Sequence, residues 1–330
     1  MFLTIIFFIL GFVFLIKGAG IMIDGSSSIA KRYGISNFFI GLTIVAFGTS
    51  APELVISALA SIKGSSGIAL GNIIGSNISN TLLILGVSAI ICPLIVRRAT
   101  VHKEIPFSLL AILAVGILAN DFLIDGQNGS IYNSLTRIDG LILILFFSIF
   151  IYYTFGITKD KEPIIAKAAE QLKEKKADMH SNIVSILMII AGLAGLAVGG
   201  RWIVDGAIAM ANYFSLSEAF IGLTIVAIGT SLPELAASAT AAYRGKTDIA
   251  VGNVIGSNIF NLFWVLGLSS IISAIGYNPV LNIDLLILIA ITILLLFLIY
   301  IGKKNILGKW EGMVLVLLYL CYLMFLVCRG

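Results

Sequence analysis

IGLTIVAFGTSAPELVISALASIKGSSGIALGNIIGSNISNTLLILGVSAII, at residues 40–91, recurs at residues 221–272 as IGLTIVAIGTSLPELAASATAAYRGKTDIAVGNVIGSNIFNLFWVLGLSSII. The two copies align without a gap at an offset of 181 residues (234 − 53), which pairs Glu53 with Glu234. Each glutamate directly follows a proline inside a strongly apolar run. Two acids kept at matching places in such surroundings require a physical explanation.

The composition restricts the class of protein before any motif is considered. Hydrophobic residues make up 59% of the 330 residues and charged residues 12%. A soluble domain carries about 25% charged residues, so we expect a polytopic membrane protein in the lipid bilayer. The apolar start lacks a basic region and runs into further membrane pattern, which favours a first span over a cleaved signal. Cys92, Cys321 and Cys328 show no metal-ligand spacing and are interpreted as apolar filler.

The apolar segments predict an all-α protein with ten membrane spans. The first and sixth segments are too long for one upright span, so we expect them to tilt strongly or to bend at glycines such as Gly18, Gly20, Gly199 and Gly200. The predicted spans lie at about 2–30, 36–62, 68–92, 104–120, 138–157, 182–212, 217–243, 249–273, 280–302 and 310–328.

Cations between the predicted spans are concentrated on one side of the membrane. That side holds Arg97, Arg244, Lys246 and the Lys-rich segment 158–181, whereas the other side holds few. Because loops rich in Lys and Arg stay in the cytoplasm, we expect a cytoplasmic membrane protein with both termini outside and the Lys-rich loop inside. This loop is interpreted as a solvated linker with a short helix after Pro163. Contact of its lysines with the membrane surface is the alternative.

The repeat extends upstream of the quoted stretch and defines two halves of five spans. We place the halves at residues 1–157 and 182–330, joined by the linker 158–181. Because five is odd, the second half would enter the membrane in the opposite direction, an architecture of transporters with a site at the midplane. Further matched pairs at the same offset are Gly11 with Gly192, Gly18 with Gly199, Asp24 with Asp205 and Ser36 with Ser217.

The GTS-x-PE segment predicts a broken helix beside an acid. Pro52 has no N–H, and its ring clashes with the carbonyl four residues back, so the helix must kink or unwind there. The freed carbonyls near residues 46–49 need partners in a dry environment, and a cation is one. Thr49 lies one turn before Glu53, so hydroxyl, carboxylate and carbonyl oxygens can converge. An acid at a helix centre costs about 2.5–3.5 kcal/mol on insertion, which favours a function over a purely structural role.

The second copy repeats this arrangement, and a further polar motif follows in both copies. Side chains spaced four residues apart lie on one helix face, so the GN-x-IGSN-x-x-N segment predicts a polar stripe. Glycines four apart allow close helix approach. Interhelical hydrogen bonding is one reading of the stripe, and oxygen ligands beside the glutamates are the other. The stripe and its glycines comprise Asn72, Ser76, Asn80, Gly71 and Gly75, and in the second copy Asn253, Ser257, Asn261, Gly252 and Gly256.

The predicted ligands are oxygen atoms only, which hard cations such as Ca²⁺, Mg²⁺ and Na⁺ prefer. Two carboxylates would neutralise one divalent ion or largely offset two or three monovalent ions. One site could hold either load but not both, and this competition is the physical basis of an exchanger. Proton coupling and a cation channel with an acidic ring are alternatives. An intramembrane enzyme is disfavoured, because no nucleophile, metal triad or cofactor motif accompanies the acids.

These paired segments resemble the two α-repeats of the sodium/calcium exchangers, within the calcium/cation antiporter superfamily. The resemblance is greatest to the prokaryotic ten-span members and covers nearly the whole chain, with α-repeats at about 36–92 and 217–273. It implies Na⁺ and Ca²⁺ as transported ions and a gate formed by spans one and six. No cofactor, nucleic acid or required protein partner is expected. The implied ion ligands are Glu53, Glu234, Thr49, Thr230, Ser50, Ser231, Ser76, Ser257, Asn80, Asn261 and the carbonyls of Ala46 and Ala227.

Asn261 departs from the pattern of the resembled family. Several relatives carry Asp at this position, and an acid there resembles the potassium-dependent branch. Asn261 therefore argues mildly against K⁺ coupling.

Asp24 and Asp205 match each other near the ends of the first and sixth spans. Helix-end hydration or capping and a gating role are the two alternative interpretations of this pair.

Overall fold

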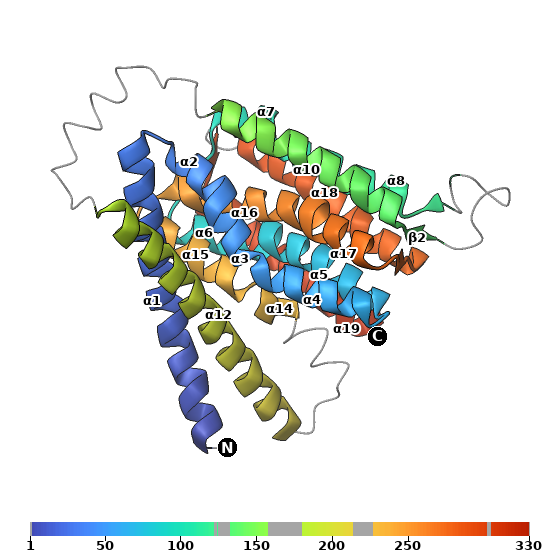
Figure 1. The fold of residues 1–330 in the computed structure, drawn as a ribbon, viewed down its shortest axis with the longest axis horizontal. Coiled ribbons are helices and arrows are strands. Elements are labelled where there is room, and N and C mark those ends of the chain that lie inside the picture. The colour runs from blue at the N-terminus through green and yellow to red at the C-terminus, as the bar shows by residue number, and fades with distance from the viewer. Residues whose placement is uncertain are drawn as a thin grey trace.

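The computed structural model describes residues 2–121, 124, 133–157, 180–213, 227–301 and 305–329. These residues form a bundle of helices with two very short pairs of strands (Figure 1). The first half contains α1 (Phe2–Tyr33), α2 (Asn37–Ile40), α3 (Ala46–Thr49), α4 (Ala51–Ile62), α5 (Ser66–Ser79), α6 (Leu85–Ile91), α7 (Arg98–His102), α8 (Glu104–Leu118) and α10 (Arg137–Ile157). The second half contains α12 (Asn182–Tyr213), α14 (Ala227–Thr230), α15 (Leu232–Tyr243), α16 (Thr247–Ile259), α17 (Leu266–Ile272), a 3₁₀ turn at Pro279–Leu281, α18 (Asn282–Ile301) and α19 (Lys309–Arg329).

Eight helices within the described residues are long and apolar enough to cross a membrane. The bent pair Asn37–Thr49 and Ala51–Ile62 makes a ninth if it counts as one span. The predicted span at 217–243 is described only from residue 227 onward, and residues 214–226 lie outside the described part. The linker at 158–179, with its predicted helix after Pro163, also lies outside it.

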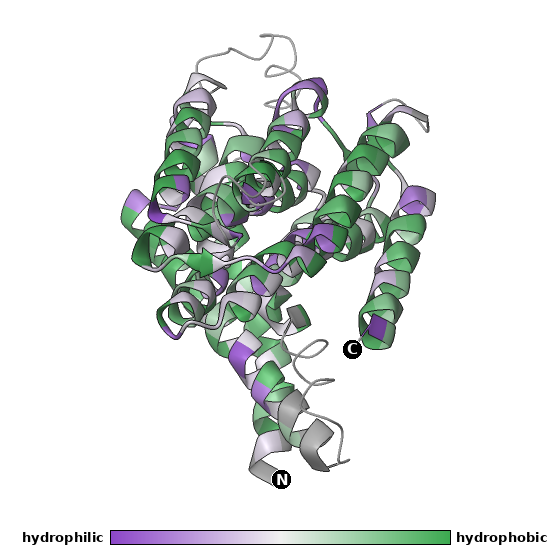
Figure 2. Cartoon of the chain, turned by 90° about the vertical axis from the view of Figure 1, so that its right-hand side faces the viewer, coloured by the Kyte–Doolittle hydropathy of each residue, from purple (hydrophilic) through white to green (hydrophobic). Residues whose placement is uncertain are grey.

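The hydropathy of the surface is that of a membrane-type protein. Apolar residues face outward along the long helices (Figure 2), among them Leu145, Phe297 and Leu317, each at least 60% exposed. Among the described spans, the most buried is Thr247–Ile272, where 94% of the apolar stretch lies inside the protein. Ser66–Ile91 follows with 78%. Lys309–Arg329 reaches only 22%. The two helices that carry the predicted polar stripes therefore form the centre of the bundle.

Helices α1 and α12 run side by side and extend beyond the rest of the bundle (Figure 1). Each is one continuous helix, without a break at its glycines. The glycines allow close contact instead: a Cβ built on Gly18 would lie 2.8 Å from the Gly192 carbonyl oxygen, and one on Gly11 would lie 2.9 Å from that of Gly199. Residue numbers rise along α1 as they fall along α12, so the pair is antiparallel.

Two antiparallel strand pairs fasten loops of the two halves, and neither was predicted. Strand β1 (Leu94–Ile95) pairs with β4 (Ile306–Leu307), which precedes α19. Strand β3 (Ile275–Gly276), the equivalent of β1 at the 181-residue offset, pairs with β2 (Ser134–Leu135), which precedes α10. Each half thus receives a strand from the other at the same structural position.

Within the described residues, three π-helical turns interrupt the α-helices. They lie at Gly41–Val45, Asn80–Ile84 and Phe260–Val265, and the last two contain the final asparagine of each predicted polar stripe. Such turns are frequent at functional sites, where they shift the helix register. Apolar periodicity does not reveal them.

Candidate cation site

The predicted helix break is confirmed beside Pro52. The chain bends by 43° between Asn37–Thr49 and Ala51–Ile62, with Ser50 in a non-helical conformation at the bend. Proline suits the first turn of a helix because its missing N–H has no partner there anyway. The break therefore places Glu53 in the first turn of α4, and the second copy places Glu234 in the first turn of α15. A helix N-terminus favours negative charge.

The two glutamates belong to one site. Both are completely buried. The hydroxyl of Ser50, at the bend that leads into Glu53, donates to Oε1 of Glu234 at 3.0 Å. The hydroxyl of Ser76, on α5, donates to Oε1 of Glu53 at 3.4 Å. Residues predicted from separate segments of both halves are thus brought together.

Two asparagines hold the broken helices in place through reciprocal contacts. The Thr49 hydroxyl donates to Oδ1 of Asn253 at 3.1 Å, and the Thr230 hydroxyl donates to Oδ1 of Asn72 at 3.3 Å. These two contacts are equivalent at the 181-residue offset. The amide of Asn253 donates to Ser238 Oγ at 2.9 Å, and that of Asn72 donates to Ser57 Oγ at 3.0 Å. Both asparagines therefore position the site by linking helices.

The expected free carbonyl at Ala46 is not found. Its oxygen accepts the amide of Ser50 at 3.0 Å and the hydroxyl of Thr49 at 3.4 Å. The reason is that α3 continues to Thr49, so the ordinary helical hydrogen bond closes before the bend. In the second half, the amide of Ser231 bonds to the Ile228 oxygen at 3.1 Å.

Several buried oxygens of the predicted ligand set have no hydrogen-bond partner among the described residues. Leaving one such group unsatisfied costs about 1–3 kcal/mol, so these oxygens are candidates for contact with a ligand. Carboxylate, carbonyl and hydroxyl oxygens together match the preference of hard cations. The atoms are Oε2 of Glu53 and Glu234, Oγ of Ser231 and Ser257, and Oδ1 of Asn80 and Asn261.

An amide cluster at the centre of the bundle orients two of these oxygens. The amide of Asn80 donates to Oδ1 of Asn258 at 3.1 Å, and the amide of Asn261 donates to Oδ1 of Asn77 at 3.2 Å. Asn258 in turn donates to Thr81 Oγ1 at 2.9 Å. Because their nitrogens are engaged, Asn80 and Asn261 keep their Oδ1 atoms for another partner. Sequence reasoning missed Asn77 and Asn258, although the duplicated GSN tripeptide contains both.

The close helix approach predicted from the paired glycines is confirmed in the second half. A Cβ on Gly252 would lie 2.6 Å from the Phe38 oxygen, and one on Gly256 would lie 2.5 Å from the Leu42 oxygen. The segment equivalent to Phe38 and Leu42 falls at 219–223, outside the described residues, so the prediction for the first-half glycines is not tested.

Within the described residues, no three His, Cys, Asp or Glu side chains gather in one place. The site thus consists of two acids surrounded by neutral oxygens, carried by helices that are broken at the middle of apolar spans. This arrangement defines a class of membrane protein, the secondary transporter with broken helices at its binding site.

The chain belongs to the sodium/calcium exchanger protein family, whose model matches residues 3–156 and 184–328. It is 37% identical over 328 residues to CaxA of Alkalimonas amylolytica, classed by name as an antiporter, covering 98% of each chain. It is 32% identical over 348 residues to the sodium/calcium exchanger MaX1 of Methanosarcina acetivorans, covering 96% of this chain and 97% of that protein. A more partial match is the Ca²⁺/H⁺ antiporter ChaA of Bacillus subtilis, 30% identical over 224 residues, covering 66% of this chain and 63% of that protein.

A solved structure agrees with the fold. The sodium-calcium exchanger NCX_Mj, soaked with 10 mM Na⁺ and 10 mM Sr²⁺, superposes with a TM-score of 0.80 at 34% identity, covering 97% of each chain. The protein is therefore an antiporter of this family.

Proposed function

We propose that this antiporter exchanges Na⁺ for Ca²⁺ across the cytoplasmic membrane, with inward Na⁺ driving Ca²⁺ outward. The observation that carries the proposal is the pair of buried glutamates, one from each half, surrounded by unpartnered oxygens. Two buried negative charges need compensation, since isolated ions lose several kcal/mol of hydration. One Ca²⁺ supplies it, and so do two or three Na⁺, but the site cannot hold both loads. The named sodium/calcium exchangers among the similar proteins support this choice of ions.

The ligands would be the set predicted from the sequence, with one adjustment. Glu53 and Glu234 would supply the charge, and Asn80 and Asn261 would supply amide oxygens. The carbonyl of Ala46 would become a ligand only after its helical hydrogen bonds opened. The remaining ligands would be Thr49, Ser50, Ser76, Thr230, Ser231, Ser257 and the Ala227 carbonyl.

The proposal includes ten spans in two inverted halves, 1–157 and 182–330, joined by the linker 158–181. Support comes from contacts that are reciprocal between equivalent residues, such as Thr49 with Asn253 and Thr230 with Asn72. Reciprocal contacts of this kind are the mark of two-fold symmetry. The equivalent helices α1 and α12 are antiparallel, as oppositely inserted halves require. Both termini would lie outside and the Lys-rich loop inside the cell.

Alternating access would follow from movement of α1 and α12 against the other spans. These two helices pack closely on each other along glycines and extend beyond the bundle, so they form a structural pair (Figure 1). Moving the pair would expose the central site to one side of the membrane at a time.

The decisive experiment is uptake of radioactive Ca²⁺ by liposomes that contain the purified protein. With Na⁺ inside and none outside, uptake should be fast, and with choline inside it should fall to the level of empty liposomes. Uptake of equal rate under both conditions would exclude Na⁺ coupling.

Exchange of Ca²⁺ for H⁺ is the second candidate, favoured by the partial match to a Ca²⁺/H⁺ antiporter. Two buried acids can carry protons as well as cations. In the same liposomes, uptake that follows an imposed pH gradient and ignores Na⁺ would favour this candidate. A cation channel would instead show conductance without a coupled counter-ion.

A further inference from the structure

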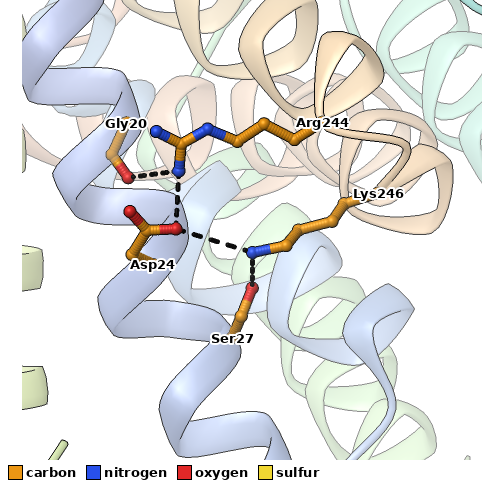
Figure 3. A network of polar contacts seen from close by, with 5 residues as sticks. All are labelled: Gly20, Asp24, Ser27, Arg244 and Lys246. Atoms are coloured by element: carbon orange, nitrogen blue, oxygen red, sulfur yellow. Dashed lines mark hydrogen bonds and ion pairs between the residues drawn. The ribbon is translucent and has the colours of Figure 1, made fainter. Parts of the chain in front are cut away.

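A cluster of charged and polar side chains ties α1 to the turn between α15 and α16 (Figure 3). Arg244 Nη1 donates to Asp24 Oδ1 at 2.5 Å and to the Gly20 carbonyl oxygen at 3.0 Å. Lys246 Nζ donates to Ser27 Oγ at 2.9 Å and lies 3.7 Å from Asp24 Oδ1. We call Asp24, Ser27, Arg244 and Lys246 the α1 latch. It joins a helix of the outer pair to a helix that carries a site glutamate.

The latch is built into the packing of α1. A Cβ on Gly20 would lie 2.7 Å from Arg244 Nη2, so a side chain at residue 20 would force the guanidinium to shift. The side chains of Arg244 and Lys246 are 34% and 27% exposed. Burial lowers the pKa of Lys246, although the neighbouring carboxylate of Asp24 opposes this effect. The Asp24 side chain is 45% exposed, so the ion pair with Arg244 is about half exposed, and Lys246 is the most buried of the three charged groups.

The equivalent position in the second half is constructed differently. At the 181-residue offset, Asp24 corresponds to Asp205, Gly20 to Arg201 and Arg244 to Lys63. Asp205 lies 3.6 Å from Arg201 on its own helix, and these side chains are 63% and 82% exposed. The arginine of the second half thus occupies the place that Gly20 leaves open. Among the described residues, the acid of α1 joins two helices, whereas the acid of α12 is paired within one.

We propose that the α1 latch holds α1 against α15 and biases the transporter toward the state that is closed on the cytoplasmic side, where the Lys/Arg-rich loops are predicted to lie. The inference rests on the proposed alternating access, because a bias has an effect only if α1 moves against the other spans. Opening at this end requires Asp24 to separate from Arg244 and Lys246. Half-exposed ion pairs each contribute a factor of a few to an equilibrium. Loss of Asp24 should therefore shift the ratio of the two states roughly three- to tenfold.

A thiol-labelling experiment tests this directly. Ser26 is completely buried, lies two residues from Asp24, and its hydroxyl has no partner among the described residues, so Ser26→Cys is a mild reporter substitution. The reporter is placed in a chain whose three natural cysteines are replaced by serine. The protein is embedded in lipid nanodiscs without Na⁺ or Ca²⁺, and its labelling by a membrane-impermeant maleimide is timed.

Asp24→Asn in the reporter background should speed labelling about three- to tenfold over the reporter alone. Asp205→Asn is the matched control and should leave the rate unchanged, because that acid is paired within its own helix. If Asp24→Asn does not fold, Gly20→Ala provides the test, since it displaces Arg244 while keeping every charge. The proposal would be overturned if Asp24→Asn were labelled no faster than the reporter alone, or if Asp205→Asn accelerated labelling equally. The assay involves no ion gradient, so failed Na⁺ coupling in liposomes leaves its result interpretable.

Discussion

Replacing Glu53 by glutamine should stabilise the cation-free protein and remove most of its stabilisation by Ca²⁺. Glu53 and Glu234 are both fully buried in one site, and each has one oxygen without a partner among the described residues. At pH 8.5 and without cations, the pair combines lost hydration with like-charge repulsion. Glutamine keeps the shape and removes one charge. We expect Glu53→Gln to stabilise the cation-free protein by about 1–3 kcal/mol, or roughly 2–12 °C in melting temperature at about 2–4 °C per kcal/mol.

With Ca²⁺ present, the variant should lose most or all of this advantage. A ligand at one hundred times its Kd stabilises a protein by about 2.7 kcal/mol. Removing one partner of a buried charged contact costs about 3–5 kcal/mol, so the variant's Kd should rise at least a hundredfold. The same Ca²⁺ concentration would then stabilise the variant by less than about 0.4 kcal/mol. Melting curves of the purified protein, followed by intrinsic tryptophan fluorescence, measure both quantities.

Glu104→Gln is the matched control for this prediction. Glu104 is equally buried but lies outside the site, where its Oε1 accepts the Tyr153 hydroxyl at 2.6 Å. This substitution weakens a short charge-assisted hydrogen bond, so the variant should be less stable and should keep the full Ca²⁺ response. The reasoning would be refuted if Glu53→Gln lowered the melting temperature without cations and responded to Ca²⁺ as the parent does.

Two further substitutions test how the site is supported. Gly256→Ala places a Cβ 2.5 Å from the Leu42 oxygen, so overpacking of about 1–3 kcal/mol should lower the melting temperature by several degrees. Gly116→Ala is the control, because its Cβ meets only Leu285 at 3.9 Å, and it should leave the melting temperature unchanged or raise it. Equal melting temperatures of the two variants would contradict the close helix approach at Gly256. Asn253→Ala leaves Thr49 and Ser238 without their shared partner, so we expect about 1–3 kcal/mol of destabilisation and weaker Ca²⁺ binding by titration calorimetry. Ser148→Ala, which removes only an exposed hydroxyl, is the control, and unchanged Ca²⁺ affinity in Asn253→Ala would exclude a positioning role.

The sequence predicted the parts of the structure that depend on local chemistry. Proline cannot continue the preceding helix, so the bend beside Pro52 follows from residue type alone, and the structure confirms it. The duplication predicted that Glu53 and Glu234 would share a site, and the Ser50 contact brings their helices together. Span positions also follow from apolar runs, and the observed helices agree within a few residues wherever the chain is described.

The remaining features depend on contacts between distant residues. A π-helical turn begins at Asn80, the last residue of the polar stripe, and a single sequence carries no periodic signal for it. Asn77 and Asn258 lie off the predicted stripe and become important only because the two halves meet there. Gly18 and Gly199 serve close contact between α1 and α12, which a single sequence does not indicate. The pairing of Asp24 with Arg244 spans most of the chain, which no local pattern can indicate.

Na⁺-dependent Ca²⁺ uptake tests the central claim most directly when parent, Glu53→Gln and Glu234→Gln are compared in the same liposomes. The two-glutamate site predicts fast uptake by the parent with internal Na⁺, and uptake at the level of empty liposomes for both variants at normal protein incorporation. Near-normal Na⁺-dependent uptake by either variant would contradict the claim that one glutamate from each half forms a shared cation site.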